Sequence, residues 1–134
     1  MKIVVDTNIL FSFFWKKSIT RKLLTTSNLE LISPIITLKE LEKYSKEIIN
    51  KTNLTRKEFD IEINNLKEII NFIDKKDYYD FLKEAEKLSP DKGDTEFIAL
   101  CLKYSCFLWS NDSLLKAQDK IRVLSTEEII DVLF

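Results

Sequence analysis

Two aspartates, Asp6 and Asp112, follow short apolar stretches that are typical of buried strands. Asp6 comes directly after Ile3-Val4-Val5, and Asp112 follows the stretch Cys106-Phe107-Leu108-Trp109 after only two intervening residues. Functional groups collect at the carboxyl ends of strands in open parallel sheets, so we expect both carboxylates at the same edge of one sheet. This convergence depends on the strand assignments alone.

Each of these aspartates also has a purely structural interpretation, and so does Asp94. All three stand just before a predicted helix, where an aspartate side chain accepts hydrogen bonds from free amides of the first turn. For Asp94 and Asp112 the capping and functional interpretations remain equally open. Asp6 is harder to explain as a cap alone, because its strand is predicted to be central in the sheet.

Glu40 is the fourth acid of interest. It lies three residues after Thr37, which is the spacing of a capping box. However, Ser33-Pro34 predicts an earlier helix start, since a serine N-cap followed by proline is a frequent beginning of a helix. That start would leave Glu40 one turn inside the helix with no amide to cap.

Four carboxylates at one edge of a sheet would repel one another. A like-charged pair at ~4 Å costs roughly 1 kcal/mol in water and about 4 kcal/mol at an effective dielectric constant of 20. A fold retains such a cluster when a divalent cation neutralises it, and ligands that are all oxygens favour magnesium or manganese over zinc. Such a metal can lower the pKa of a bound water and shield the charge that develops on a phosphate.

The composition excludes most other catalytic designs. The chain has no histidine, which removes the commonest general base and the serine–histidine and cysteine–histidine pairs. The chain has a single glycine, Gly93, whereas a phosphate-binding P-loop or a dinucleotide-binding turn needs several. The two cysteines, Cys101 and Cys106, are interpreted as free thiols without a function.

Short apolar strands alternate with helical segments along the chain, which predicts a parallel sheet covered on both faces. The expected fold class is therefore α/β, a three-layer α/β/α sandwich in one domain spanning residues 1–134. Predicted strands cover residues 3–5, 29–32, 72–73, 106–109 and 122–124, and predicted helices cover about 9–27, 34–48, 56–70, 78–88, 95–104, 114–118 and 126–133. No apolar run is long enough to cross a membrane and no signal peptide precedes Asp6, so a cytoplasmic protein is expected.

Lysine and arginine gather in two places. One cluster contains Lys16, Lys17, Arg21 and Lys22, and the other contains Lys51, Arg56 and Lys57. A nucleic-acid-binding protein could use such patches beside an acidic metal site. Each cluster taken alone is more simply explained as the solvated face of a helix.

Four segments of the chain resemble the motifs of PIN domains. The first is residues 4–10 (VVDTNIL) and the second is residues 33–41 (SPIITLKEL), whose acid is Glu40. The third is residues 91–100 (DKGDTEFIAL), carried by Asp94, and the fourth is residues 110–115 (SNDSLL), with Ser110 and Asp112. Each motif is weak by itself, but four in order over most of the chain are fairly specific.

The resemblance implies a metal-dependent endoribonuclease that cuts single-stranded RNA. It implies that Asp6, Glu40, Asp94 and Asp112 hold one or two Mg²⁺ or Mn²⁺ ions and carry catalysis. By the same likeness Asn8 and Ser110, with Asp91 as a further acid, position substrate or ligands. Many short PIN proteins are VapC-type toxins, so an antitoxin partner and a homodimer are further expectations that come from the family alone.

Other protein classes fit less well. Haloacid-dehalogenase-like phosphatases need a second aspartate two residues after the first, where this chain has Asn8. A receiver domain needs an acidic pair near the first strand, and Asp6 stands alone there. Two alternatives stay open within the PIN resemblance: a nuclease that processes ribosomal RNA, and a catalytically silent module that binds nucleic acid or protein.

Overall fold

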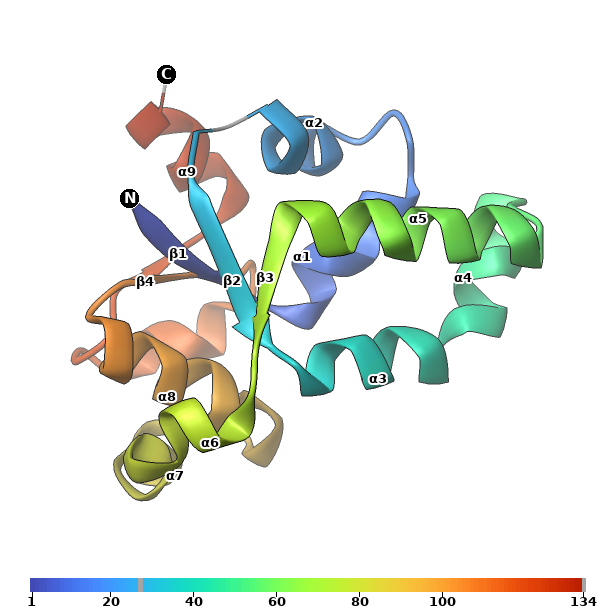
Figure 1. Ribbon diagram of the computed structural model, residues 1–134. Helices are drawn as coiled ribbons and strands as arrows, with labels where there is room; N and C mark the ends of the chain where they lie inside the picture. The colour runs from blue at the N-terminus through green and yellow to red at the C-terminus, as the bar shows by residue number, and fades with distance from the viewer. Residues whose placement is uncertain (27, 134) are drawn as a thin grey trace.

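The computed structural model describes residues 1–26 and 28–133. Its centre is a parallel sheet of five strands in the order β3-β2-β1-β4-β5 (Figure 1). The strands are β1 (Lys2–Val5), β2 (Glu30–Pro34), β3 (Ile70–Ile73), β4 (Phe107–Trp109) and β5 (Val123–Leu124). β1 is central, as its apolar sequence predicts, because it pairs with β2 on one side and with β4 on the other.

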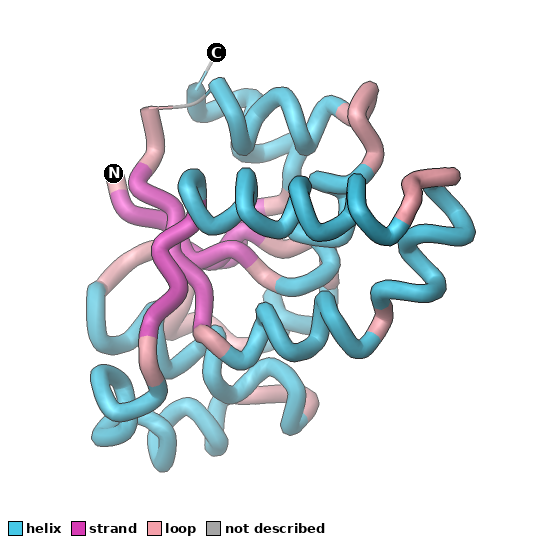
Figure 2. The backbone as a smooth tube through the Cα atoms, turned by 45° about the vertical axis from the view of Figure 1, so that its right-hand side comes forward, coloured by secondary structure: helices cyan, strands magenta, loops and turns pink. Residues whose placement is uncertain are grey.

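Helices cover both faces of the sheet, which confirms the predicted three-layer α/β/α class (Figure 2). Alternate side chains of β1 pack on opposite faces of the sheet. Ile3 and Val5 belong to one buried cluster, which also contains Phe59. Val4 belongs to the other buried cluster, which also contains Ile98. A strand buried on both faces therefore has to be apolar throughout.

The helices are α1 (Thr7–Phe11), α2 (Ile19–Thr26), α3 (Ile36–Lys43), α4 (Ser45–Thr52), α5 (Arg56–Ile69), α6 (Lys75–Tyr78), α7 (Leu82–Leu88), α8 (Thr95–Tyr104) and α9 (Thr126–Leu133). Short 3₁₀ turns are η1 (Ser12–Phe14), η2 (Tyr79–Phe81), η3 (Lys92–Asp94) and η4 (Ser113–Ala117). The predicted bounds of α8 and α9 are confirmed. The predicted helix 9–27 is interrupted near Ser18 as expected, and its last residue, Ser27, lies outside the described part.

The predicted helix start at Ser33-Pro34 is wrong. Both residues belong to β2, and α3 begins only at Ile36. Ser33 is fully buried, and its hydroxyl donates to the Val5 carbonyl at 2.9 Å, while the amide of Ile35 donates to the Ile73 carbonyl at 2.8 Å. Pro34 is tolerated there because it is the last residue of the strand and its missing amide is not required.

A single helix over residues 34–48 was also expected, but the segment forms α3 and α4 with a break at Tyr44. With α5 these two helices form an arm to one side of the sheet (Figure 1). Thr55 and Glu58 form a capping box at the start of α5 and so fix the turn that leads into this helix. None of the helices within residues 1–26 and 28–133 is long and apolar enough to span a membrane.

Candidate active site

An aspartate follows the carboxyl end of β1 and another follows that of β4, at the same edge of the sheet, as predicted. Asp6 follows β1 and caps α1, with its Oδ1 accepting from the Ile9 amide at 2.9 Å. Asp112 lies beyond β4, and its Oδ1 accepts from the Leu114 amide at 3.0 Å. The capping interpretation is therefore true of both residues, yet it does not compete with function, because each carboxylate has a second oxygen that is not used by the cap.

Asp94 and Glu40 are positioned without capping bonds. Asp94 precedes α8 but makes no side-chain hydrogen bond to its first turn. Glu40 lies in α3, and the hydroxyl of Thr37 faces Ser33 Oγ at 3.0 Å instead of capping the helix. The capping-box interpretation of Glu40 is therefore rejected, although the helix start that first argued against it was misplaced.

All four predicted acids line one cleft of about 420 Å³. Asn8 and Asp91 also line it, whereas Ser110 is buried behind the wall with 1% of its surface exposed. The complete lining is Asp6, Thr7, Asn8, Phe11, Glu40, Tyr44, Asp91, Gly93, Asp94, Phe97 and Asp112. Residues from four separate segments are thus brought to one concave surface at the end of the sheet, although their roles there stay predictions.

Burial and mutual repulsion raise the pKa values of two of these carboxyls. The pKa of Asp94 is raised to about 6, first by burial and then by the charges of Asp112, Asp91 and Asp6. Burial also raises the pKa of Asp6, against hydrogen bonds from the Ser110 hydroxyl and the Ile9 amide, and the charge of Asp112 adds to the increase. The aspartates of the cleft are therefore close enough for their negative charges to repel one another.

Glu40 is near different neighbours. Burial raises its pKa, the nearby Thr7 hydroxyl lowers it, and the charge of Glu96 raises it further. Glu96 accepts a hydrogen bond from the buried Tyr78 hydroxyl. Thr7 Oγ1 is the one fully buried side-chain polar atom without a hydrogen-bond partner among the described residues, so it lies near Glu40 but not in bonding geometry.

Thr7 and Glu96 were missed by the sequence reasoning as contributors to this site. Both lie inside the matched motifs, Thr7 next to Asp6 and Glu96 two residues after Asp94. The sequence does not predict that Glu96 lies near Glu40, because the two residues belong to helices that are far apart in the chain, α3 and α8. The tertiary contact supplies that information.

The donor chemistry of the cleft suits a hard divalent cation, since its charged groups are carboxylates and its remaining polar groups are hydroxyl and amide oxygens. Within residues 1–26 and 28–133, however, no three acidic or thiol side chains are arranged closely enough to form a metal site. The acids share a cleft, but their carboxylates are not close enough together to coordinate one ion. Their free carboxylate oxygens would have to move toward a cation.

The fold and the cleft together define an α/β protein with an acidic site at the carboxyl edge of a parallel sheet. Residues 4–129 match the PIN domain, and the chain belongs to this family. No curated protein matches its sequence closely enough to be counted as a relative.

A structural neighbour supports the same fold. A chain of the crystal structure of VapBC2 from Rickettsia felis, bound to a DNA fragment from their promoter, is similar with a TM-score of 0.64 and 16% sequence identity. The likeness covers 93% of this chain and 98% of that one. At this identity the comparison establishes a shared fold.

Proposed function

We propose that this protein is a metal-dependent endoribonuclease that hydrolyses single-stranded RNA and acts as the toxin of a VapBC-type toxin–antitoxin pair. The observation that carries the proposal is the cluster of carboxylates in one cleft of a PIN-family chain, where Asp6 is buried and the charges of neighbouring aspartates raise the pKa of the half-buried Asp94. PIN domains are generally metal-dependent nucleases. The toxin assignment depends on the likeness to VapBC2 and is tested separately below.

Asp6, Glu40, Asp94 and Asp112 would hold Mg²⁺ or Mn²⁺ in this proposal. A bound dication would lower the pKa of a water and shield the charge that develops on the phosphate. The side chain of Asp6 is held in place by the Ile9 amide and the Ser110 hydroxyl, whereas Asp94 has no cap bond and is free to turn toward a ligand. Asn8 and Asp91 line the same cleft and would position the substrate or the ligands.

The first test is cleavage of a mixed-sequence single-stranded RNA with Mn²⁺ or Mg²⁺, with an EDTA control and the Asp6→Asn protein. Asp131→Asn is the matched control, since Asp131 is an exposed acid on α9 that does not line the cleft. Cleavage that is lost with EDTA and in Asp6→Asn but retained in Asp131→Asn supports the nuclease. A folded protein that binds Mn²⁺ but cuts no RNA would favour a binding module.

The toxin role is tested in cells. Expression of the protein alone should arrest growth, and co-expression with the product of a small reading frame next to its gene should relieve the arrest. The Asp6→Asn protein should be harmless at the same expression level. A nuclease that is active in vitro but does not arrest growth would instead point to processing of ribosomal RNA.

A further inference from the structure

The acidic cleft continues into a groove of different chemistry. Phe11 and Tyr44 line both the cleft and an adjoining pocket of about 150 Å³. Trp15 and Lys51 line both that pocket and a larger cavity of about 630 Å³. Because they share these lining residues, the three hollows lie next to one another in series, from the carboxylates at the end of the sheet to the turn between η1 and α2.

Aromatic rings line this groove at intervals. Tyr44 is 40% exposed and Trp15 is 39% exposed, whereas the other tryptophan, Trp109, is fully buried in the core. Phe11 packs against Tyr44 in a T-shaped arrangement with ring centroids 5.8 Å apart, which limits how the tyrosine ring turns. Large exposed rings in a concave surface are available to stack against planar groups of a ligand.

The far end of the groove is basic. Lys16, Lys17 and Lys51 line its largest cavity, together with the hydroxyls of Ser12, Ser18 and Thr52. Among the described residues, Lys16 and Lys17 form no ion pair, and Lys51 pairs only with Glu47 at 2.8 Å, with both side chains more than half exposed. An exposed pair of this kind is worth less than about 1 kcal/mol, so Lys51 can exchange Glu47 for a phosphate.

We propose that this groove, lined by Tyr44, Trp15, Lys16, Lys17 and Lys51, is the binding track for the single-stranded RNA that leads into the acidic cleft. Bases stack on Tyr44 and Trp15, and the lysines contact the phosphates. Single strands fit this surface better than duplexes because stacking on a protein ring needs unpaired bases. The inference rests on the proposed function for the identity of the ligand, but it concerns binding and not hydrolysis.

The position of Trp15 provides a direct readout. A short unstructured oligoribonucleotide is titrated into the wild-type protein in EDTA, where metal-dependent cleavage cannot occur, and tryptophan emission is followed. Stacking of a base on Trp15 should quench part of the emission, while Trp109 should not respond because it is buried. The Trp15→Phe protein, in which only Trp109 emits, should show no change.

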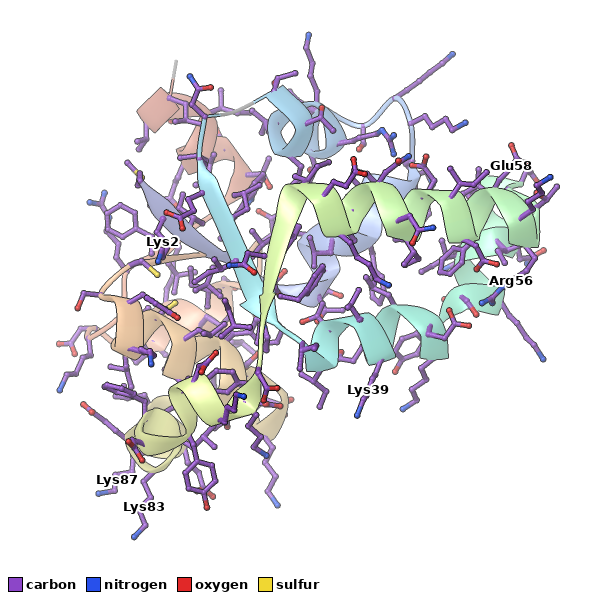
Figure 3. All side chains as sticks on the ribbon, in the orientation of Figure 1. Lys2, Lys39, Arg56, Glu58, Lys83 and Lys87 are labelled. Atoms are coloured by element: carbon purple, nitrogen blue, oxygen red, sulfur yellow. The ribbon has the colours of Figure 1, made fainter. Side chains whose placement is uncertain are left out.

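Charge variants test the lysines. Lys16→Glu/Lys17→Glu is compared with Lys83→Glu/Lys87→Glu, which makes the same change of charge on α7. Lys16 lies close to Glu58, whose pKa is lowered by hydrogen bonds from Thr55 and by the charge of Lys16. Figure 3 labels Glu58 on the arm, on the side of the molecule away from Lys83 and Lys87. Neither control lysine lines the cleft or the groove.

The groove variant should weaken RNA binding at least tenfold, and the slope of log Kd against log salt should fall by about 1.4, or about 0.7 for each lost phosphate contact. Trp15→Ala should weaken binding by about tenfold, as expected when one stacked base is lost. In the cleavage assay both changes should raise KM and leave kcat nearly unchanged. The thermal unfolding midpoint of each variant should match that of the wild type.

The outcomes separate the two proposals. Quenching without any cleavage would reject the nuclease and keep the RNA track. Cleavage with KM equal in the groove variant and the α7 control would reject the track and keep the nuclease. No quenching and no response to salt would also overturn the track, and loss of antitoxin binding alone in the groove variants would assign the surface to the protein partner.

Discussion

Two buried carboxylates in this molecule, Glu62 and Asp6, have neighbours of opposite charge. Glu62 is 6% exposed and forms an ion pair with Arg21, which also donates to the Phe13 carbonyl and lies over the Phe13 ring at 4.2 Å. Asp6 is 9% exposed, and the charges near it belong to other carboxylates. Similar burial thus occurs in an ion pair that joins α2 to α5 and in a carboxylate of the cleft that has no cationic partner among the described residues.

The difference distinguishes an acid held in a structural ion pair from the acids that we propose to be functional. A buried ion pair that has lost one partner leaves an unsolvated charge, so the pair stabilises the native state only while it is complete. Asp6 has no such partner within residues 1–26 and 28–133, and burial together with the charge of Asp112 raises the pKa of its carboxyl. Perturbed carboxyls that face a cleft are for this reason better candidates for a site than those that face an arginine.

The largest effect is expected when the closed pair is broken. Arg21→Met should lower the free energy of unfolding by about 3–5 kcal/mol, because Glu62 is left buried without its cation. Urea denaturation measures this loss, and Lys51→Met is the control, since its exposed pair with Glu47 should cost less than about 1 kcal/mol. Equal losses in the two variants would show that the Arg21–Glu62 pair is effectively solvated.

Removing a charge from the cleft should lower activity without lowering the free energy of unfolding. Asp6→Asn should lower nuclease activity by at least about 100-fold, since even groups that only support a metal ligand contribute about 10–100-fold. Its free energy of unfolding without metal should not fall, because asparagine also caps the helix and the repulsion from Asp112 disappears. Activity assays with Mn²⁺ and urea denaturation in EDTA measure the two effects. A destabilised Asp6→Asn protein would contradict the contrast with Glu62.

The pKa of Asp94 predicts a pH dependence. This pKa is raised from 3.8 to about 6, so the folded protein holds the proton more tightly than the unfolded chain. Without metal, the unfolding free energy should therefore fall as the pH rises from about 4 to about 6. Affinity for Mn²⁺ should show the opposite trend and weaken about tenfold per pH unit below 6, since a protonated carboxyl is a poor ligand.

Calorimetric titration of Mn²⁺ and thermal unfolding in EDTA measure the two trends. Asp94→Asn should flatten both of them. A Mn²⁺ affinity that stays constant between pH 5 and pH 7 would remove Asp94 from the proposed ligand set.

The smallest effect concerns the buried hydroxyl near Glu40. Thr7→Val should change the free energy of unfolding by less than about 1 kcal/mol, in the stabilising direction, because the hydroxyl it removes has no hydrogen-bond partner. Urea denaturation without metal gives the value. A loss greater than about 1 kcal/mol would show that Thr7 does donate to Glu40 in solution.

The strand-end aspartates show how much of the site the sequence could predict. Asp6 and Asp112 were placed at one sheet edge from apolar runs alone, because parallel strands direct their carboxyl ends the same way. Asp94 and Glu40 were considered from the sequence as acids that capping alone could explain, and their place in the set of metal ligands came from the PIN resemblance. The helix start at Pro34 was misjudged, because local capping preference was outweighed by the pairing of Ser33 and Pro34 with β3.

By itself, the sequence determined the alternation of apolar strands and helices, the order of the acids along the chain and the absence of histidine chemistry. These are local or compositional properties that survive without knowledge of contacts. Only the tertiary structure decided that Glu40 lies near Thr7 and Glu96 and that Glu62 pairs with Arg21. It also decided that a pocket shared with the acidic cleft lies beside the cavity that Lys16 and Lys17 line. Such pairings join segments far apart in the chain, and their geometry is set by how helices pack on the sheet, which no short sequence pattern records.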